Sequence, residues 1–222
     1  MLLLTASAPP FYKNAYLVAC ETTREAILID PGDEVEELIR AASDERLTVG
    51  RILLTHAHLD HITGVARAKD AFAAPVYLHE ADVPLYDAVV QQGQMFGLDV
   101  KAQPPVDRFY DPGEVLQFGS YDVGVHHTPG HSPGGVCLQI AARGTPALDL
   151  FVGDTLFAGS IGRVDLPGGD FATLIRSITG VLFAFGDEAR IYPGHGEPTT
   201  IGRERRTNPF LTASDRGQTP SA

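Results

Sequence analysis

The segment His56-Ala57-His58-Leu59-Asp60-His61 places four side chains that can bind metals within six positions of the chain. It directly follows an apolar run, Arg51-Ile52-Leu53-Leu54-Thr55, which predicts a short buried strand. Side chains at i and i+2 of an extended chain point the same way, so His56 and His58 can converge on one point. A turn into a helix near Asp60 would direct Asp60 and His61 toward a second point nearby. Because imidazole and carboxylate groups suit zinc, iron or manganese, the segment predicts half of a two-metal site.

Three later segments each end a strand-like run in a sharp turn that carries a further metal-binding side chain. These are His131 in Thr128-Pro129-Gly130-His131-Ser132-Pro133-Gly134-Gly135, Asp154 after Leu150-Phe151-Val152-Gly153, and His195 in Ile191-Tyr192-Pro193-Gly194-His195-Gly196. Proline and glycine fix tight turns. A histidine that lies between glycines after a buried strand is difficult to explain by core packing. Together with the first segment, these turns predict the remaining ligands.

The other polar candidates have less specific settings. Asp30 ends a predicted strand, where it could hydrogen-bond a ligand histidine or simply form the turn Asp30-Pro31-Gly32. The histidines outside the glycine-rich turns are interpreted as structural: His79, His126 and His127. Both cysteines, Cys20 and Cys137, lie in apolar runs and are predicted to be buried small hydrophobic residues rather than a disulfide framework.

Composition and charge limit the classes of function. The 222 residues have an apolar fraction of 44%, which predicts one domain over residues 1–211 and a flexible polar tail over 212–222. A formal charge of −11 should repel phosphate backbones, so no nucleic-acid partner is expected. No apolar run approaches the length of a membrane span, and the amino terminus lacks the basic start and the apolar length of a signal peptide. A cytoplasmic enzyme is therefore expected.

Strand-like and helix-like segments alternate along the chain, which predicts a layered α/β or α+β domain. Strands are predicted over residues 2–6, 16–20, 26–29, 52–54, 76–78, 114–118, 121–127, 136–141, 148–152 and 190–192. Helices are predicted over residues 35–42, 61–72, 83–90 and 171–185. Residues 91–111 are rich in glycine, proline and polar side chains and predict a long loop that forms part of a substrate entrance.

In this order, His56-x-His58-x-Asp60-His61, His131, Asp154 and His195 resemble the ligand pattern of the metallo-β-lactamase superfamily over nearly the whole chain. The resemblance implies an α+β fold, a four-layer αββα sandwich, with metals at one edge between two β-sheets. It implies that His56, His58 and His131 bind a first metal and that Asp60, His61 and His195 bind a second. Asp154 would bridge both metals. The implied cofactors are two divalent ions, zinc by preference, with iron or manganese also accepted.

Within the superfamily the chain is most similar to short, single-domain type II glyoxalases, the hydroxyacylglutathione hydrolases. The supporting stretches are Gly162-Arg163-Val164-Asp165, Pro193-Gly194-His195-Gly196 and the segment from Thr199 to Phe210. The resemblance implies a small-molecule thioester substrate, a glutathione conjugate such as S-D-lactoylglutathione, and no membrane partner. Arg163 could bind a carboxylate of that substrate.

The implied reaction is thioester hydrolysis by a metal-bound hydroxide. Two cations would lower the pKa of a shared water to about 7, and Asp60 would orient the resulting hydroxide toward the thioester carbonyl. A leaving thiol has a reference pKa of about 8.5 and departs as thiolate, so no dedicated general acid is required. An amide or lactam would need such an acid, which makes it a poorer fit.

Two alternatives stay open at this point. The stretches Gly162-Arg163-Val164-Asp165 and His61-Ile62-Thr63-Gly64 are also similar to persulfide dioxygenases, which use one iron held by two histidines and one aspartate. That enzyme would oxidise glutathione persulfide. The third possibility is a non-catalytic metal-binding or redox partner module.

Overall fold

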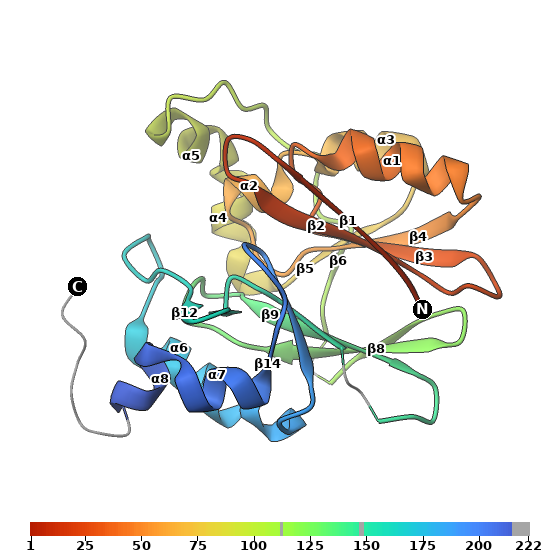
Figure 1. Ribbon diagram of the computed structural model, residues 1–222. Helices are drawn as coiled ribbons and strands as arrows, with labels where there is room; N and C mark the ends of the chain where they lie inside the picture. Colours follow the sequence, from red (N-terminus) through yellow and green to blue (C-terminus); the bar gives the residue numbers. More distant parts are fainter. Residues whose placement is uncertain (112, 147–148, 215–222) are drawn as a thin grey trace.

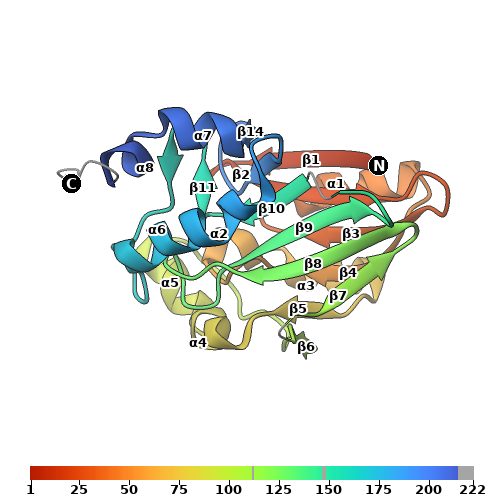
Figure 2. The same ribbon diagram turned by 90° about the horizontal axis from the view of Figure 1, so that it is seen from below.

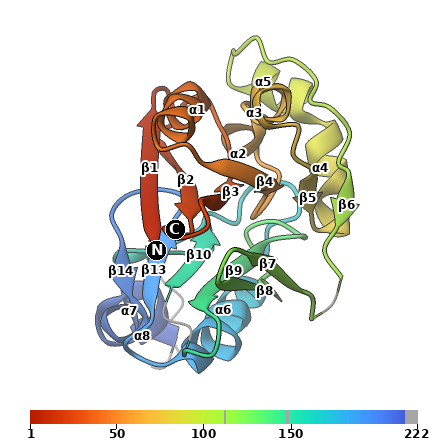
Figure 3. The ribbon, with the colours of Figure 1, turned by 90° about the vertical axis from the view of Figure 1, so that its right-hand side faces the viewer.

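The computed structural model describes residues 1–111, 113–146 and 149–214, and these residues form four layers. Two six-stranded sheets face each other, and helices cover the outer face of each sheet (Figures 1 and 3). The α+β sandwich of αββα type that the sequence predicted is confirmed.

The first sheet is built from the first half of the chain. Its strands are β1 (Leu2–Ala8), β2 (Lys13–Ala19), β3 (Glu25–Ile29), β4 (Thr48–Leu53), β5 (Val76–Leu78) and β6 (Arg108–Phe109), in that spatial order. Strands β1 to β3 pair antiparallel, whereas β3 to β6 pair parallel. Parallel pairing requires crossover connections, and helices of the outer layer supply two of them.

The second sheet is built mainly antiparallel from the second half. Its order is β14 (Thr199–Thr200), β13 (Arg190–Pro193), β10 (Asp149–Gly153), β9 (Val136–Ala142), β8 (Tyr121–His127) and β7 (Val115–Phe118). Only β10 and β13 run parallel to each other. A separate small hairpin joins β11 (Leu156–Phe157) to β12 (Ser160–Ile161).

Helices lie on both outer faces and at one end of the molecule. They are α1 (Val35–Asp44), α2 (Leu59–Ile62), α3 (Val65–Phe72), η1 (Glu80–Asp82), α4 (Val83–Asp87), α5 (Val89–Met95), α6 (Phe171–Gly180), η2 (Leu182–Phe185), α7 (Ile201–Thr207) and α8 (Pro209–Ser214). Figure 2 shows α2, α5 and α6 gathered at the same end.

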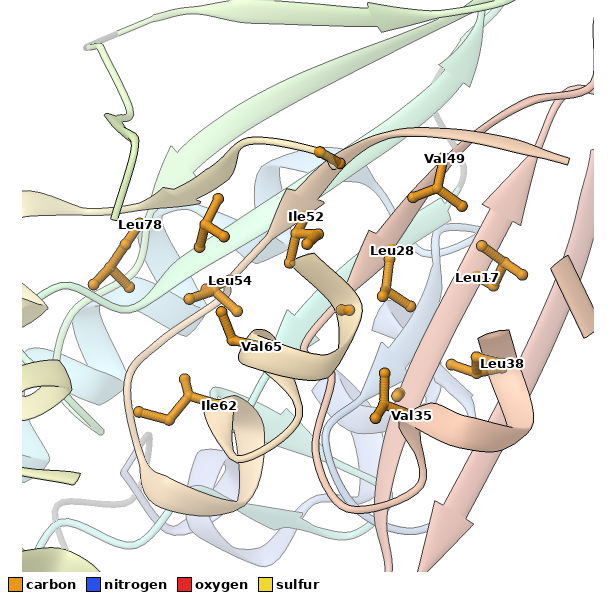
Figure 4. Packing of buried hydrophobic residues seen from close by; sticks show 14 of the residues in the cluster. Leu17, Leu28, Val35, Leu38, Val49, Ile52, Leu54, Ile62, Val65 and Leu78 are labelled. Atoms are coloured by element: carbon orange, nitrogen blue, oxygen red, sulfur yellow. The ribbon is translucent and has the colours of Figure 1, made fainter. Parts of the chain in front are cut away.

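Three apolar clusters hold the layers together, one between each pair of adjacent layers. Figure 4 shows the first, where Val35 and Leu38 of α1 and Val65 of α3 pack with Leu28 and Ile52 of the first sheet. Val35, Leu38 and Ala42 recur at helical spacing and are all buried, which is why an otherwise polar segment lies on the sheet as a helix. The sheets are thereby held rigid up to the edge where their strands end.

Some sequence predictions were wrong in their boundaries. The helix predicted over 61–72 is two helices, α2 and α3, because the chain breaks at Thr63 and Gly64. Helix α5 and strand β6 occupy part of the loop predicted over 91–111. The flexible tail predicted from residue 212 begins too early, because 212–214 belong to helix α8; residues 215–222, and Leu148 of one predicted strand, lie outside the described residues.

Helices α7 and α8 and strand β14 were not predicted at all. Among the helices of the described residues, none has the length and apolar character needed to cross a bilayer.

Candidate metal centre

The candidate ligands lie where strands of both sheets end at one edge of the sandwich. His56 follows β4, Asp154 follows β10 and His195 follows β13. Strand β8, which leads to His131, runs antiparallel to β9, and β9 runs antiparallel to β10, so β8 and β10 end at the same edge. The carboxyl ends of these strands therefore bring ligands from positions 56 to 195 together.

The local conformation of residues 56–61 divides their side chains between two points. His58 is extended, with φ −72° and ψ 150°, and it caps helix α2, which begins at Leu59. The helical turn directs Asp60 and His61 to a different group of candidate ligands from the one that contains His56 and His58. The backbone therefore passes from extended to helical near Asp60, as the sequence predicted.

The first cluster consists of His56, His58 and His131, all buried. His131 Nε2 lies 2.8 Å from His58 Nδ1 and 3.2 Å from His56 Nε2. A tetrahedral zinc ion with bonds of about 2.0–2.1 Å would hold its ligand nitrogens about 3.3 Å apart. The two spacings from His131 are thus close to those of a tetrahedral site, and all three nitrogen atoms lie within 4.8 Å of one another.

The second cluster consists of Asp60, His61 and His195. His195 Nε2 lies 3.1 Å from Asp60 Oδ2, and His61 Nε2 lies 3.8 Å from the same oxygen. This set combines two imidazoles with one carboxylate, a donor set that zinc, iron and manganese accept.

Asp154 lies between the two clusters. Its Oδ1 is 3.3 Å from His61 Nε2, and its Oδ2 is 3.6 Å from His131 Nε2 and 3.5 Å from His195 Nε2. One carboxylate therefore faces both clusters with different oxygens. The structure brings together all seven candidate ligands that the sequence singled out.

The electrostatics of the clusters favour bound cations. Burial and the neighbouring histidines lower the pKa of His56 well below its usual value, and burial with His131 lowers the pKa of His58 to about 3, so both rings are neutral donors. Burial also disfavours a charge on His61, but Asp60, Asp154 and Asp30 outweigh it and raise the pKa of His61 to about 10. The carboxylates around His61 thus create a position where positive charge is strongly stabilised.

Buried atoms without partners mark where ions would fit. Within the described part of the chain, the buried side-chain atoms that lack a hydrogen-bond partner are His58 Nε2, His61 Nε2, Thr63 Oγ1 and Asp154 Oδ1. Leaving such atoms unsatisfied is costly, and two of them, His61 Nε2 and Asp154 Oδ1, lie 3.3 Å apart beside the second cluster. The donor set and these orphaned atoms fit divalent metal ions.

A hydrogen-bond chain behind the clusters orients two of the histidines. Asp30 accepts hydrogen bonds from the backbone N and Oγ1 of Thr55, each 2.6 Å long, and from His61 Nδ1 at 2.9 Å. His56 Nδ1 lies 3.1 Å from Thr55 Oγ1. Because Nδ1 of both rings is directed backwards, Nε2 of both rings faces the site. Asp30 adopts a left-handed backbone with φ 50°, which places its carboxylate behind the ligands.

Asp82 is a residue that the sequence analysis missed. It is fully buried, and its carboxylate accepts hydrogen bonds from Ala57 N (3.0 Å), Ser132 Oγ (2.9 Å) and Gly134 N (2.5 Å). Asp82 therefore ties the loop that carries His56 and His58 to the loop that carries His131. Its position, directly before Val83-Pro84, gave no signal in the sequence, because only the fold brings it near the ligands.

Arg163 lines the cavity over the clusters, but its side chain already has a partner. Its Nε and Nη2 each lie 2.7 Å from Asp165. Its backbone carbonyl accepts a hydrogen bond from His131 Nδ1 at 2.8 Å, a contact that sequence reasoning did not anticipate.

The remaining histidines and the cysteines have structural surroundings. The rings of His79 and His127 stack 4.2 Å apart, and His126 Nε2 lies 2.6 Å from Gln139. Cys20 and Cys137 are free and buried, as predicted.

Comparison with known proteins gives consistent matches. The sequence profile of the Metallo-beta-lactamase superfamily matches residues 8–195. Among curated proteins, the hydroxyacylglutathione hydrolase GloC of Haemophilus influenzae is 38% identical over 205 residues, which cover 91% of this chain and 94% of that protein.

Two solved structures extend the comparison. TTHA1623, crystallised in a di-iron-bound form, is 43% identical with a TM-score of 0.82, over 95% of this chain and 100% of that one. ETHE1 from Myxococcus xanthus is 26% identical with a TM-score of 0.76, over 99% of this chain and 92% of that one.

Proposed function

This chain belongs to the metallo-beta-lactamase superfamily, and from that membership we propose that it is a metal-dependent thioester hydrolase. The proposed substrate is an S-(2-hydroxyacyl)glutathione such as S-D-lactoylglutathione, which would be cleaved to glutathione and a 2-hydroxy acid. The relative named hydroxyacylglutathione hydrolase, aligned along almost the whole chain, supports this substrate class.

The observation that carries the proposal is the position of the Asp154 carboxylate between two clusters, 3.3 Å from His61 and 3.6 Å from His131. In our proposal His56, His58 and His131 hold one divalent ion, Asp60, His61 and His195 hold a second, and Asp154 bridges them. Zinc is the expected metal, and the di-iron form of a relative supports iron as the competing choice.

When bound, the two ions would supply Lewis acidity, which acidifies water and polarises a carbonyl oxygen. The side chain of Asp60 lines the cavity, so its carboxylate can accept a hydrogen bond from the attacking water and direct it at the thioester carbon. With one proton released to solvent, the water oxygen bonds to the thioester carbon while the C=O electron pair moves onto the carbonyl oxygen, and the return of that pair breaks the carbon–sulfur bond. The sulfur leaves as thiolate, because a thiol has a reference pKa of about 8.5, so the reaction requires no dedicated general acid.

The proposal is tested with the metal-loaded protein by measuring hydrolysis of S-D-lactoylglutathione and counting metals by elemental analysis. We expect turnover together with two metals per chain. Two metals without cleavage of the thioester would reject the substrate while leaving the site intact. A single metal would reject the bridged arrangement.

The second candidate is a mono-iron persulfide dioxygenase, which the similarity to ETHE1 keeps open. Oxygen uptake with glutathione persulfide and one iron per chain would favour it. The cytoplasmic location and the contact between Arg163 and a substrate carboxylate stay predictions.

A further inference from the structure

An apolar groove continues from the candidate metal centre along helices α4 and α5. It has a volume of about 320 Å³, and we call it the side groove. Its apolar wall is formed by Leu85, Ala88, Met95, Phe96, Leu166 and Pro167. His58 and Gln92 line both the side groove and the cavity over the metal clusters. The groove therefore opens beside a metal-binding histidine.

The wall of the side groove exposes large apolar side chains, and their exposure to water is unfavourable. Met95 is 69% exposed and Phe96 is 46% exposed, and both are large. Contiguous apolar surface of this kind marks a place where a ligand or partner binds. Phe96 is held in place by the ring of Phe11, whose centroid lies 5.7 Å away at an edge-to-face angle.

The groove is rigidly attached to the loop that carries the ligands. The side-chain oxygen of Gln92 accepts a hydrogen bond from Leu59 N at 3.0 Å. Its nitrogen donates to the carbonyls of Ala57 at 3.1 Å and Leu85 at 2.7 Å. One side chain thus fixes α5 and the groove against the segment between His56 and Asp60, so the groove is formed before a ligand arrives.

The charges around the two cavities favour an uncharged acyl group. Among the described residues that line the two cavities, Arg163 is the only lysine or arginine. Its guanidinium group already donates hydrogen bonds to both carboxylate oxygens of Asp165. An anionic acyl chain would meet no free cation in the groove.

We propose that the side groove binds an apolar acyl chain of the thioester substrate, extending from a carbonyl placed beside His58. The inference rests on the proposed thioesterase function and extends its acyl groups to ones longer and more apolar than lactoyl. A short hydroxyacyl group would reach only the cavity over the clusters and leave Leu85, Ala88, Met95 and Pro167 of the apolar wall uncovered.

The test compares kcat/KM of the metal-loaded enzyme for a series of straight-chain S-acylglutathiones from acetyl to octanoyl. Each buried methylene should raise kcat/KM about threefold until the groove is filled. If the acetyl thioester is hydrolysed but kcat/KM does not rise along the series, the side groove does not bind the acyl chain, and the proposed thioesterase function still holds. Cleavage of neither S-D-lactoylglutathione nor any member of the series would reject the proposed function instead.

The groove can be examined even in that second case through binding alone. S-alkylglutathiones are not hydrolysed, so calorimetry of S-methyl and S-octyl glutathione reports affinity without chemistry. We expect the octyl compound to bind at least tenfold more tightly. Equal affinities would reject the groove as a site for an apolar chain.

Two variants locate the effect. Met95→Glu places a carboxylate on the exposed wall, and Ala88→Phe fills the groove, so each should lower the ratio of kcat/KM for octanoyl over acetyl by about threefold or more. The matched controls are Val115→Glu and Ala71→Phe, at exposed positions that line neither cavity, and the ratio should stay at its wild-type value. A ratio that falls equally in the controls would contradict the assignment.

Discussion

At the scale of single residues, glycines constrain the centre as tightly as the ligands do. A Cβ on Gly194 would lie 2.1 Å from Asp154 Oδ1 and 2.7 Å from His61 Cε1. Only glycine allows the chain before His195 to pass so close to both side chains. The glycines around His195 stand out in the sequence, but only the fold shows that one of them borders Asp154.

The substitution Gly194→Ala should therefore damage the second cluster without removing any ligand. We expect metal content to fall from two ions toward one per chain and kcat to fall by at least tenfold, because the methyl group displaces Asp154 or His61. Elemental analysis and turnover check this. Gly180→Ala is the control, since no atom lies within 4 Å of its added Cβ; two retained metals in Gly194→Ala would contradict the argument.

Replacing His61 separates the two candidate functions. His61→Ala removes a donor from the second cluster only, so the hydrolase proposal predicts one remaining metal and loss of thioester turnover. His126→Gln serves as control, since His126 contacts Gln139 rather than the clusters. If the His61→Ala variant holds one iron and keeps full oxygen uptake with glutathione persulfide, the dioxygenase is the better assignment.

At the scale of elements, Asp82 joins two loops that each carry ligands. Asp82→Asn replaces one accepting oxygen with a donor that faces the backbone NH of Ala57 or Gly134. Loss of a group that orients ligands typically costs about 10–100-fold in metal affinity, and we expect a loss in that range. Competition with a chelator measures it, and Asp87→Asn, an exposed neighbour in α4, should leave the affinity unchanged.

The same scale shows why parts of the fold escaped the sequence analysis. At the break in the predicted helix, Gly64 N donates to the carbonyl of Pro31 at 3.0 Å, and a Cβ on Gly64 would lie 2.2 Å from the carbonyl of Gly32. Periodicity cannot reveal such contacts between separate segments. Helix α5 was missed because Gly93 lies within it, and Gly93 packs against Val100. The ligand-bearing turns were predictable, since each combines a buried strand with local proline or glycine, whereas Asp82 depends on tertiary contacts alone.

At the scale of the whole molecule, the two sheets contribute different ligands to one centre. His56, His58, Asp60 and His61 follow a strand of the first sheet, and His131, Asp154 and His195 follow strands of the second. Bound metals would therefore link the two halves across their shared edge.

Removal of metal should lower the thermal stability of the fold. With free metal at about 100 times its Kd, binding adds about 2.7 kcal/mol, which corresponds to about 5–10 °C in Tm for a chain of this size. Calorimetry with and without a chelator measures the shift. A Tm that does not respond to chelation would mean that metals do not join the halves.

The final ligand loop also contacts the start of the chain. Asn14 N donates to the Gly194 carbonyl at 2.7 Å, and the Tyr16 hydroxyl donates to the Pro193 carbonyl at 2.6 Å. His195 is the last of the seven candidate ligands along the chain, so the second cluster gains its third member only when residue 195 has been synthesised, whereas His56, His58 and His131 are available earlier. In our proposal the order of the ligands along the chain therefore lets the first metal position form before the second during synthesis.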